Sequence, residues 1–359
     1  MKKMIKVAAV IAVFALITAS CASAKKEGGQ EPPVAADFVL VSGSTFDGTT
    51  ALTPESRVFF EGRTVEIGDL YVCDHEVTQE EYETYCVYFS SYPREEYHTA
   101  GKNFPASFMN WYDALVYCNL RSLAEGLTPV YSLGGETDPR KWEGMVAADS
   151  DDKDGMRFYL RSIEDGFFPV YKLEEEDVLP RSWEEMTAPG NGVKFCGLFT
   201  NDDSRLRALW DGVSMDMSAG GYRLPTDAEW EYVARGADWT STYTYSGSDD
   251  IDEVAWWYGN DGGETHDVKT KKPNALGIYD MTGSVREMCW DWYYQTLQPS
   301  TPATGPVQGT MPFELVFRVV RGGEHVSAFS HNVSVRSVDL NMRTFMATGF
   351  RVVRSAYGR

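Results

Sequence analysis

The chain has 359 residues, of which 13% are aromatic, and a formal net charge of −20. This length suffices for one large domain or two ordinary ones, and so many aromatic residues argue against a disordered chain. The strongly acidic balance argues against binding to nucleic acid and against electrostatic docking on anionic lipid.

The N-terminus has the pattern of an export signal. Residues 1–6 are basic, and residues 7–17 form an apolar run that is too short to span a membrane. Cys21 closes this run, which predicts a lipoprotein signal peptide over residues 1–21 and a lipid on Cys21, although Thr18 stands where Leu is usual. The alternative is cleavage after Ala24, which would release a soluble exported protein.

Residues 22–36 are rich in Lys, Gly and Pro and predict a flexible tether. From 37 to 357 we expect a single domain with an insertion at about 124–218. The insertion is inferred from an internal repeat, in which residues 120–131 match residues 160–171. Two copies are too few for a solenoid.

Local patterns predict several elements. Thr78 and Glu81 have the spacing of a capping box at the start of a helix. Residues 111–123 carry apolar side chains at helical spacing. Near the C-terminus we expect three strands. They are residues 318–321 running into a turn at Gly322 and Gly323, residues 333–337, and residues 349–353 opened by a turn glycine.

Metal and catalytic signatures are weak. Five cysteines remain besides Cys21, and none forms a C-x-x-C pair, while the five histidines include no H-x-x-x-H pair. Residues 149–155 resemble a calcium loop, but Leu160 stands where such loops carry glutamate, so a solvated acidic turn is the preferred interpretation. We expect no metal, no cofactor and no catalytic residue.

Two C-terminal patches, residues 325–332 and 339–345, have neither helical nor strand periodicity. Binding residues concentrate in such loops, although ordinary surface loops would give the same pattern. The candidate ligand-binding residues are His325, Ser327, Phe329, Ser330, His331, Asn332, Asp339, Leu340, Asn341, Thr344 and Phe345.

Five ordered blocks give the chain a family resemblance. They are residues 74–82 (DHEVTQEEY), 105–114 (PASFMNWYDA), 221–232 (GYRLPTDAEWEY), 273–287 (PNALGIYDMTGSVRE), and Arg321-Gly-Gly323 with Gly349-Phe-Arg351. These motifs resemble the formylglycine-generating-enzyme (sulfatase-modifying factor) family. The resemblance implies an α+β fold of the C-type lectin type, with a twisted antiparallel sheet, two helices and much ordered loop.

Active members of that family carry two cysteines at a spacing that falls here on Ser327 and Asn332. Neither side chain can replace a copper-binding thiolate, so we do not expect an oxidase. The family's calcium loop corresponds to the segment in which Ser284 replaces asparagine, Glu287 remains and Arg286 introduces a competing cation. The fold alone therefore does not predict the function.

The chain also resembles the variable proteins of diversity-generating retroelements, of the type found in Treponema. Asparagine codons randomised at both adenines yield most of the residue types of the two patches, but not Met or Glu, so Glu324, Met342 and Met346 are excluded as such sites. The resemblance implies a variable region at about 319–355 in a lipoprotein on the outer-membrane cell surface. We expect its ligand to be a protein or another surface molecule. We expect it to contact the membrane through the lipid on Cys21, to be a monomer and to bind no nucleic acid. A fixed-ligand or accessory lipoprotein of the same family is the alternative.

Overall fold

The computed structural model describes residues 34–86, 101–149, 157–162, 166–169, 193–196, 204–306, 317–327, 331–340 and 347–356. All of them belong to one compact unit that runs from Val34 onward. Within this part of the chain, no helix is both long and apolar enough to cross a membrane.

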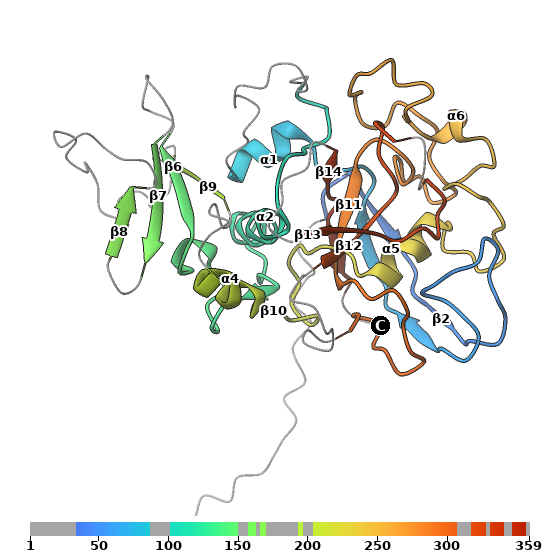
Figure 1. The fold of residues 1–359 in the computed structure, drawn as a ribbon, viewed down its shortest axis with the longest axis horizontal. Coiled ribbons are helices and arrows are strands. Elements are labelled where there is room, and N and C mark those ends of the chain that lie inside the picture. Colours follow the sequence, from blue (N-terminus) through green and yellow to red (C-terminus); the bar gives the residue numbers. More distant parts are fainter. Residues whose placement is uncertain are drawn as a thin grey trace, which may run out of the picture. The chain divides into compact units, whose positions relative to one another are not determined.

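The elements are short and many (Figure 1). The helices are α1 (Gln79–Tyr85), α2 (Trp111–Ala124), the 3-10 helix η1 (Pro139–Lys141), α4 (Ser204–Asp211), α5 (Asp227–Ala234) and α6 (Ile251–Val254). The strands are β1 (Phe38–Val41), β2 (Ser44–Phe46), β3 (Val65–Ile67), β4 (Leu70–Cys73), β5 (Tyr131–Ser132), β6 (Val146–Asp149), β7 (Arg157–Ser162), β8 (Gly166–Pro169), β9 (Val193–Cys196), β10 (Ser214–Met215), β11 (Arg286–Trp292), β12 (Phe317–Arg321), β13 (Ser337–Leu340), β14 (Thr348–Gly349) and β15 (Val353–Ser355).

The central sheet has the strand order β13-β12-β11-β14. Strands β12 and β13 are antiparallel, with Val319 opposite Val338, whereas β14 runs parallel to β11. The expected antiparallel sheet thus carries one short parallel strand, β14, at this edge. A second sheet, β1-β4-β15, pairs the first strand of the domain and the last with β4, and both pairs are antiparallel.

The central sheet lies between two hydrophobic clusters, and Figure 1 shows it between α2 and α5. Because successive strand residues point to opposite faces, neighbours on one strand join different clusters. Val320 packs in the cluster around α2, while Val319 packs in the cluster around Trp230 of α5. This arrangement holds the end of β12 rigidly from both sides.

Helix starts follow the local signals in the sequence. The predicted capping box of Thr78 and Glu81 is confirmed at the start of α1, and the predicted helix over 111–123 is confirmed as α2. The expected number of two helices is too low. Helix α5, for example, begins with a capping box of Thr226 and Glu229 that the sequence analysis did not single out.

The predicted insertion contains a four-stranded antiparallel sheet of its own, β8-β7-β6-β9 (green in Figure 1). The described parts of the chain also hold several smaller sheets, among them β2-β3 and β5-β10.

Two C-terminal strand predictions are wrong in their limits. The strand expected at 333–337 begins only at Ser337, because the Asn332 side chain accepts hydrogen bonds from the Ser334 N–H and hydroxyl and so forms a turn. The strand expected at 349–353 is divided between β14 and β15, which belong to different sheets. Gly349 is needed there for close approach rather than for a turn, since a Cβ at this position would lie 2.3 Å from the Ala106 carbonyl oxygen.

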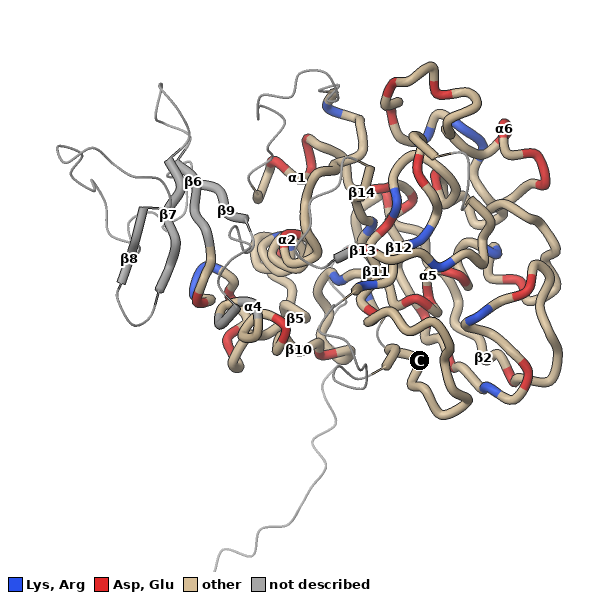
Figure 2. The backbone as a smooth tube through the Cα atoms, viewed as in Figure 1, with Lys and Arg blue, Asp and Glu red and all other residues tan. Residues whose placement is uncertain are grey.

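Buried charge is a second feature of the core. Among the described residues, six arginines have less than 2% of their surface exposed: Arg63, Arg223, Arg318, Arg321, Arg351 and Arg354. Acidic residues, by contrast, are spread over many surface loops, including those around α6 (Figure 2). Buried cations need partners of opposite charge or hydrogen-bond acceptors.

Candidate functional site

The candidate site is the loop that joins β12 to β13. It leaves β12 through Gly322 and Gly323, whose φ angles of 88° and 79° confirm the predicted glycine turn. Strand β12 and helix α5 pack together, so the loop begins on a rigid support.

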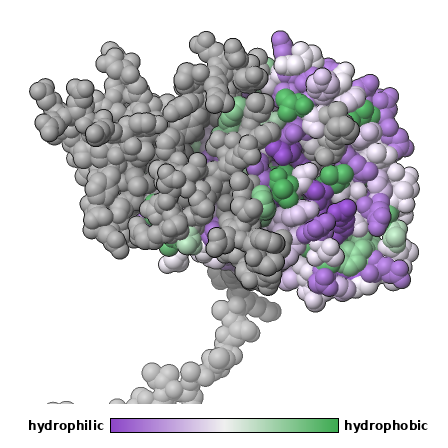
Figure 3. All heavy atoms as spheres, in the orientation of Figure 1, coloured by the Kyte–Doolittle hydropathy of each residue, from purple (hydrophilic) through white to green (hydrophobic). Residues whose placement is uncertain are grey.

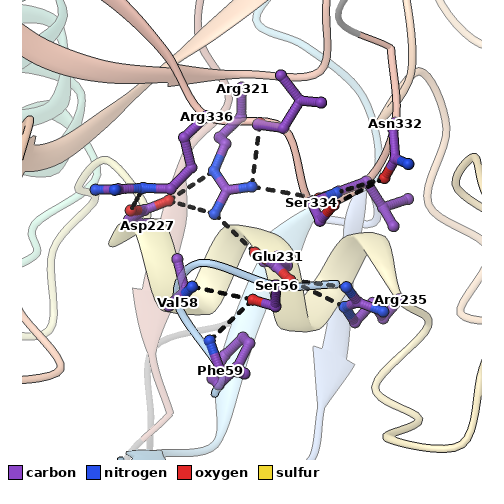
Figure 4. Close-up of polar contacts among 12 residues, drawn as sticks. Ser56, Val58, Phe59, Asp227, Glu231, Arg235, Arg321, Asn332, Ser334 and Arg336 are labelled. Atoms are coloured by element: carbon purple, nitrogen blue, oxygen red, sulfur yellow. Dashed lines mark hydrogen bonds and ion pairs between the residues drawn. The ribbon is translucent and has the colours of Figure 1, made fainter. Parts of the chain in front are cut away.

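One carboxylate holds both ends of this loop (Figure 4). Asp227, the first residue of α5, lies 2.5 Å from Arg321 Nη2 and 2.6 Å from Arg336 Nε. Arg321 also forms an ion pair with Glu231 at 2.9 Å and donates to the Val333 carbonyl at 3.3 Å. We call Asp227, Glu231, Arg321 and Arg336 the arginine clamp.

The clamp carboxylate stays ionised. Burial raises the pKa of Asp227, but the positive charges of Arg321 and Arg336 lower it further, so the net pKa is below the ordinary value. Charge-assisted hydrogen bonds of this kind are short and strong. The two loop ends are therefore fixed independently of the residues between them.

A second buried ion pair, Arg351 with Glu287, lies beside the clamp. Arg351 binds Glu287 through two contacts of 2.6 Å, and Trp230 Nε1 donates to Glu287 Oε2 at 2.7 Å. Arg351, from the motif Gly349-Phe-Arg351, thus connects the chain after β14 to β11.

Both loop histidines are held by the surrounding structure. His325 Nδ1 lies 2.9 Å from Asp261 Oδ2, and His331 Nε2 lies 3.0 Å from the Glu324 carbonyl oxygen. The ring of His331 also meets the ring of Trp257 edge-on at 6.2 Å. Burial lowers the pKa of His331, so its ring is neutral and donates its Nε2 proton to the carbonyl.

The two patches meet at Arg286 on β11. Arg286 forms an ion pair with Glu324, next to the first patch, and its guanidinium lies 3.8 Å from Asp339 of the second patch. Asp339 also accepts a hydrogen bond of 3.1 Å from the Thr348 hydroxyl. Residues distant in the sequence therefore share one cation beneath the site.

Family and structural comparisons agree with this geometry. A family model described as "Sulfatase-modifying factor enzyme 1-like domain" matches residues 24–356. The chain belongs to this family. The fold class expected from the motifs is confirmed.

Three proteins that this chain resembles carry different names. Chaperone protein LppX of Paenibacillus barcinonensis is 28% identical over 333 residues, which cover 88% of each chain. The formylglycine-generating enzyme of Streptomyces coelicolor is 30% identical over 165 residues, 41% of this chain and only 51% of the enzyme. The solved structure of Treponema denticola variable protein 1 superposes with a TM-score of 0.57 at 24% identity, covering 89% of this chain and 95% of that one. This confirms the predicted resemblance to a variable protein at the level of the fold.

Of the predicted ligand residues, the structure describes six: His325, Ser327, His331, Asn332, Asp339 and Leu340. The rings of His325 and His331 are buried, whereas Ser327, Asn332 and Asp339 are partly exposed. Asp339 and Leu340 lie on β13 and not in an irregular loop, which corrects the start of the second patch. The other candidates lie outside the described residues: Cys21, Phe329, Ser330, Asn341, Thr344 and Phe345.

Asp261 and the bridging role of Arg286 were not predicted from the sequence, and neither was the contact between Trp257 and His331. No local pattern reveals these pairs, because each joins segments far apart in the chain. Next to Trp257, the Tyr258 side chain is 67% exposed, and Val326 in the loop is 39% exposed. The visible face in Figure 3 likewise shows separate apolar patches among polar ones.

The residues at the family's metal positions do not fit those metals. Ser327 and Asn332 offer no thiolate for copper, and the Asn332 side chain is engaged in its turn. At the calcium position, the Ser284 hydroxyl donates to Glu76, and Glu287 is bound by Arg351. Glu76 and Glu287 are thus both engaged by protein groups rather than presented to a hard cation.

Proposed function

We propose that this chain is an exported, lipid-anchored surface protein that binds ligands through its C-terminal loop, and that a retroelement diversifies this loop. The arginine clamp carries the proposal. Arg321 and Arg336 grip opposite oxygens of Asp227, so the ends of the loop are set by buried ion pairs. Loop residues between Arg321 and Arg336 can then change while the domain stays folded.

The residues that randomised asparagine codons can and cannot encode have different roles in the structure, as this proposal expects. Glu324, which asparagine-codon randomisation cannot produce, has a supporting role, since it binds Arg286 and its carbonyl holds His331. The neighbouring Val326 side chain and the Tyr258 ring offer exposed apolar surface, and polar side chains such as Ser327 would add selectivity.

An oxidase of the formylglycine-generating type is the less favoured function. Its chemistry requires a redox-active thiolate, and Ser327 and Asn332 stand at the two cysteine positions. An accessory lipoprotein with a fixed partner remains the second candidate, because a relative covering 88% of this chain is named a chaperone protein.

A loop library tests the binding proposal. Residues 325, 327 and 329–332, with Glu324 and the clamp unchanged, are varied with the residue types that randomised asparagine codons encode, and the library is displayed on yeast. We expect most members to resist protease like the parent, and panning on one immobilised purified protein to enrich binders. Collapse of protease resistance in most members would contradict the proposal.

Lipid anchoring is tested separately. Bacteria producing the chain are fed radiolabelled palmitate, and the parent is compared with the Cys21→Ser variant. We expect label on the parent and none on the variant. Equal absence of label in both, with release of the parent into the medium, would instead support cleavage after Ala24.

A further inference from the structure

A group of metal-ligand side chains lies outside the candidate site, where β1 begins and β4 ends. Cys73, the last residue of β4, pairs with Phe38, the first residue of β1. This register brings Asp37 beside Cys73, and His75 follows two residues later. Potential ligand atoms of Asp37, Cys73 and His75 all lie within 4.8 Å of one another.

The separations are near those of a tetrahedral zinc site. Cys73 Sγ lies 3.7 Å from His75 Nδ1 and 3.9 Å from Asp37 Oδ2. Zinc bonds of about 2.3 Å to sulfur and about 2.0–2.2 Å to nitrogen or oxygen place tetrahedral ligands about 3.5 Å apart. A contraction of a few tenths of an ångström would therefore bring the Cys73 sulfur to zinc-ligand distances from both His75 and Asp37.

The second nitrogen of His75 already has the partner that a metal-bound histidine needs. His75 Nε2 lies 3.4 Å from Glu81 Oε2, and Glu81 is itself fixed by a 2.8 Å hydrogen bond from the Thr78 N–H. A carboxylate behind the ligating ring orients the imidazole and raises its basicity. The capping box of α1 thus prepares His75 to bind through Nδ1.

The surrounding charge favours a cation. Asp74 lies 2.6 Å from His75 Nδ1, and its other oxygen is bound by Lys269 at 2.7 Å. Asp74 and Glu81 thus flank the two ring nitrogens of His75, and their negative charges favour a cation in this place.

We propose that Asp37 Oδ2, Cys73 Sγ and His75 Nδ1 bind a structural zinc ion, with Asp74 or a water molecule in the fourth position. Binding releases the thiol proton of Cys73 and the Nδ1 proton of His75, and no oxidation occurs. The ion would fasten Asp37, at the start of the domain, to β4. Sequence spacing alone does not predict this site, because Asp37 reaches Cys73 only through the pairing of β1 with β4.

Cobalt provides the direct test, because it reports thiolate ligation by its spectrum. The full chain, purified in detergent and stripped with a chelator, is titrated with Co²⁺ and then with Zn²⁺ in competition with a chromophoric chelator. We expect one ion per chain, a thiolate-to-cobalt charge-transfer band, and its loss when zinc is added.

Variants assign the ligands. Cys73→Ser should abolish the charge-transfer band, and Asp37→Asn and His75→Gln should weaken zinc binding by more than tenfold. Glu81→Gln, which keeps an acceptor in the capping box, should weaken it by about tenfold. Cys86→Ala, at a buried cysteine outside the group, is the control and should bind like the parent.

Folding is checked for each variant by its thermal midpoint without metal. Asp37 is only partly buried, so Asp37→Asn should remain folded even if Cys73→Ser does not. The proposal is overturned if the parent shows no charge-transfer band, or if a folded Asp37→Asn variant binds zinc as tightly as the parent.

Discussion

Asp227 is the residue on which the C-terminal loop most depends, because it neutralises two arginines that water cannot reach. Its side chain and that of Arg321 are 1% and 0% exposed. Removing one member of a buried ion pair leaves an uncompensated charge, which is strongly destabilising even where the pair itself adds little net stability.

The Asp227→Asn variant should accordingly lose about 3–5 kcal/mol of unfolding free energy. Urea denaturation measures the loss, and Asp216→Asn, at an exposed aspartate whose side chain accepts hydrogen bonds from Ser218, is the control. If both variants unfold at the same urea concentration, the clamp does not hold the loop.

Asp291 makes the stability of the fold depend on pH in the opposite direction to most carboxylates. Burial, and then the charge of Asp227, raise the pKa of Asp291 to about 7 from 3.8. The folded state therefore binds one more proton than the unfolded state between these values. Stability should rise as the pH falls from about 7 towards 4, by up to about 1.4 kcal/mol per pH unit from this group.

Asp291→Asn keeps an acceptor for the Asp227 N–H, which lies 2.8 Å from Asp291 Oδ2, but cannot ionise. We expect the variant to be more stable than the parent at pH 8 and the difference to shrink at pH 5, as followed by thermal midpoints. A difference that does not change with pH would show that Asp291 titrates normally.

At the scale of elements, the passage from β14 to β15 transfers the chain between two sheets. Gly349 passes so close to Ala106 that a Cβ would lie 2.3 Å from its carbonyl oxygen, whereas a Cβ on Gly68 would meet nothing within 4 Å. Gly349→Ala should cost about 1–3 kcal/mol, as overpacking usually does, and Gly68→Ala much less. Chemical denaturation of the two variants compares them, and equal stabilities would mean that β14 moves freely.

The elements also show what the sequence can predict. The capping box of Thr78 and Glu81 was predictable because its two partners are three residues apart. The true start of β13 was not, because the preceding backbone is shaped by the Asn332 turn and by Arg336, whose partner Asp227 is 109 residues away. Likewise, the loop residues were predicted from their residue types, but Asp261 and Arg286 beneath them were not, because only the fold brings them there.

At the scale of the whole molecule, the net charge of −20 opposes compactness through repulsion between like charges. The key ion pairs are buried and little screened by salt, while surface repulsion is screened over about 10 Å at 0.1 M. Raising NaCl from near zero to physiological strength should therefore raise the thermal midpoint of the protein. A lower midpoint in salt would mean that surface ion pairs, and not the buried framework, dominate its electrostatics.

The two proposals concern different parts of the molecule. The loop between Arg321 and Arg336 would provide changeable binding, and the group at Asp37, Cys73 and His75 would fasten the start of the domain. They share no residue, so failure of the zinc proposal would leave the binding proposal intact.

The central claim, a variable binding loop on a fixed framework, is tested most directly on DNA. The measurement is the sequence of the few kilobases around the gene. We predict a near-copy of the segment that encodes residues 319–354, differing only where the copy has adenine, beside a reverse-transcriptase frame. The codons for Asp227, Arg321 and Arg336 should be unaffected by those adenines. Absence of such a copy, together with identical loops in sister isolates, would contradict the claim and favour a lipoprotein with one fixed partner.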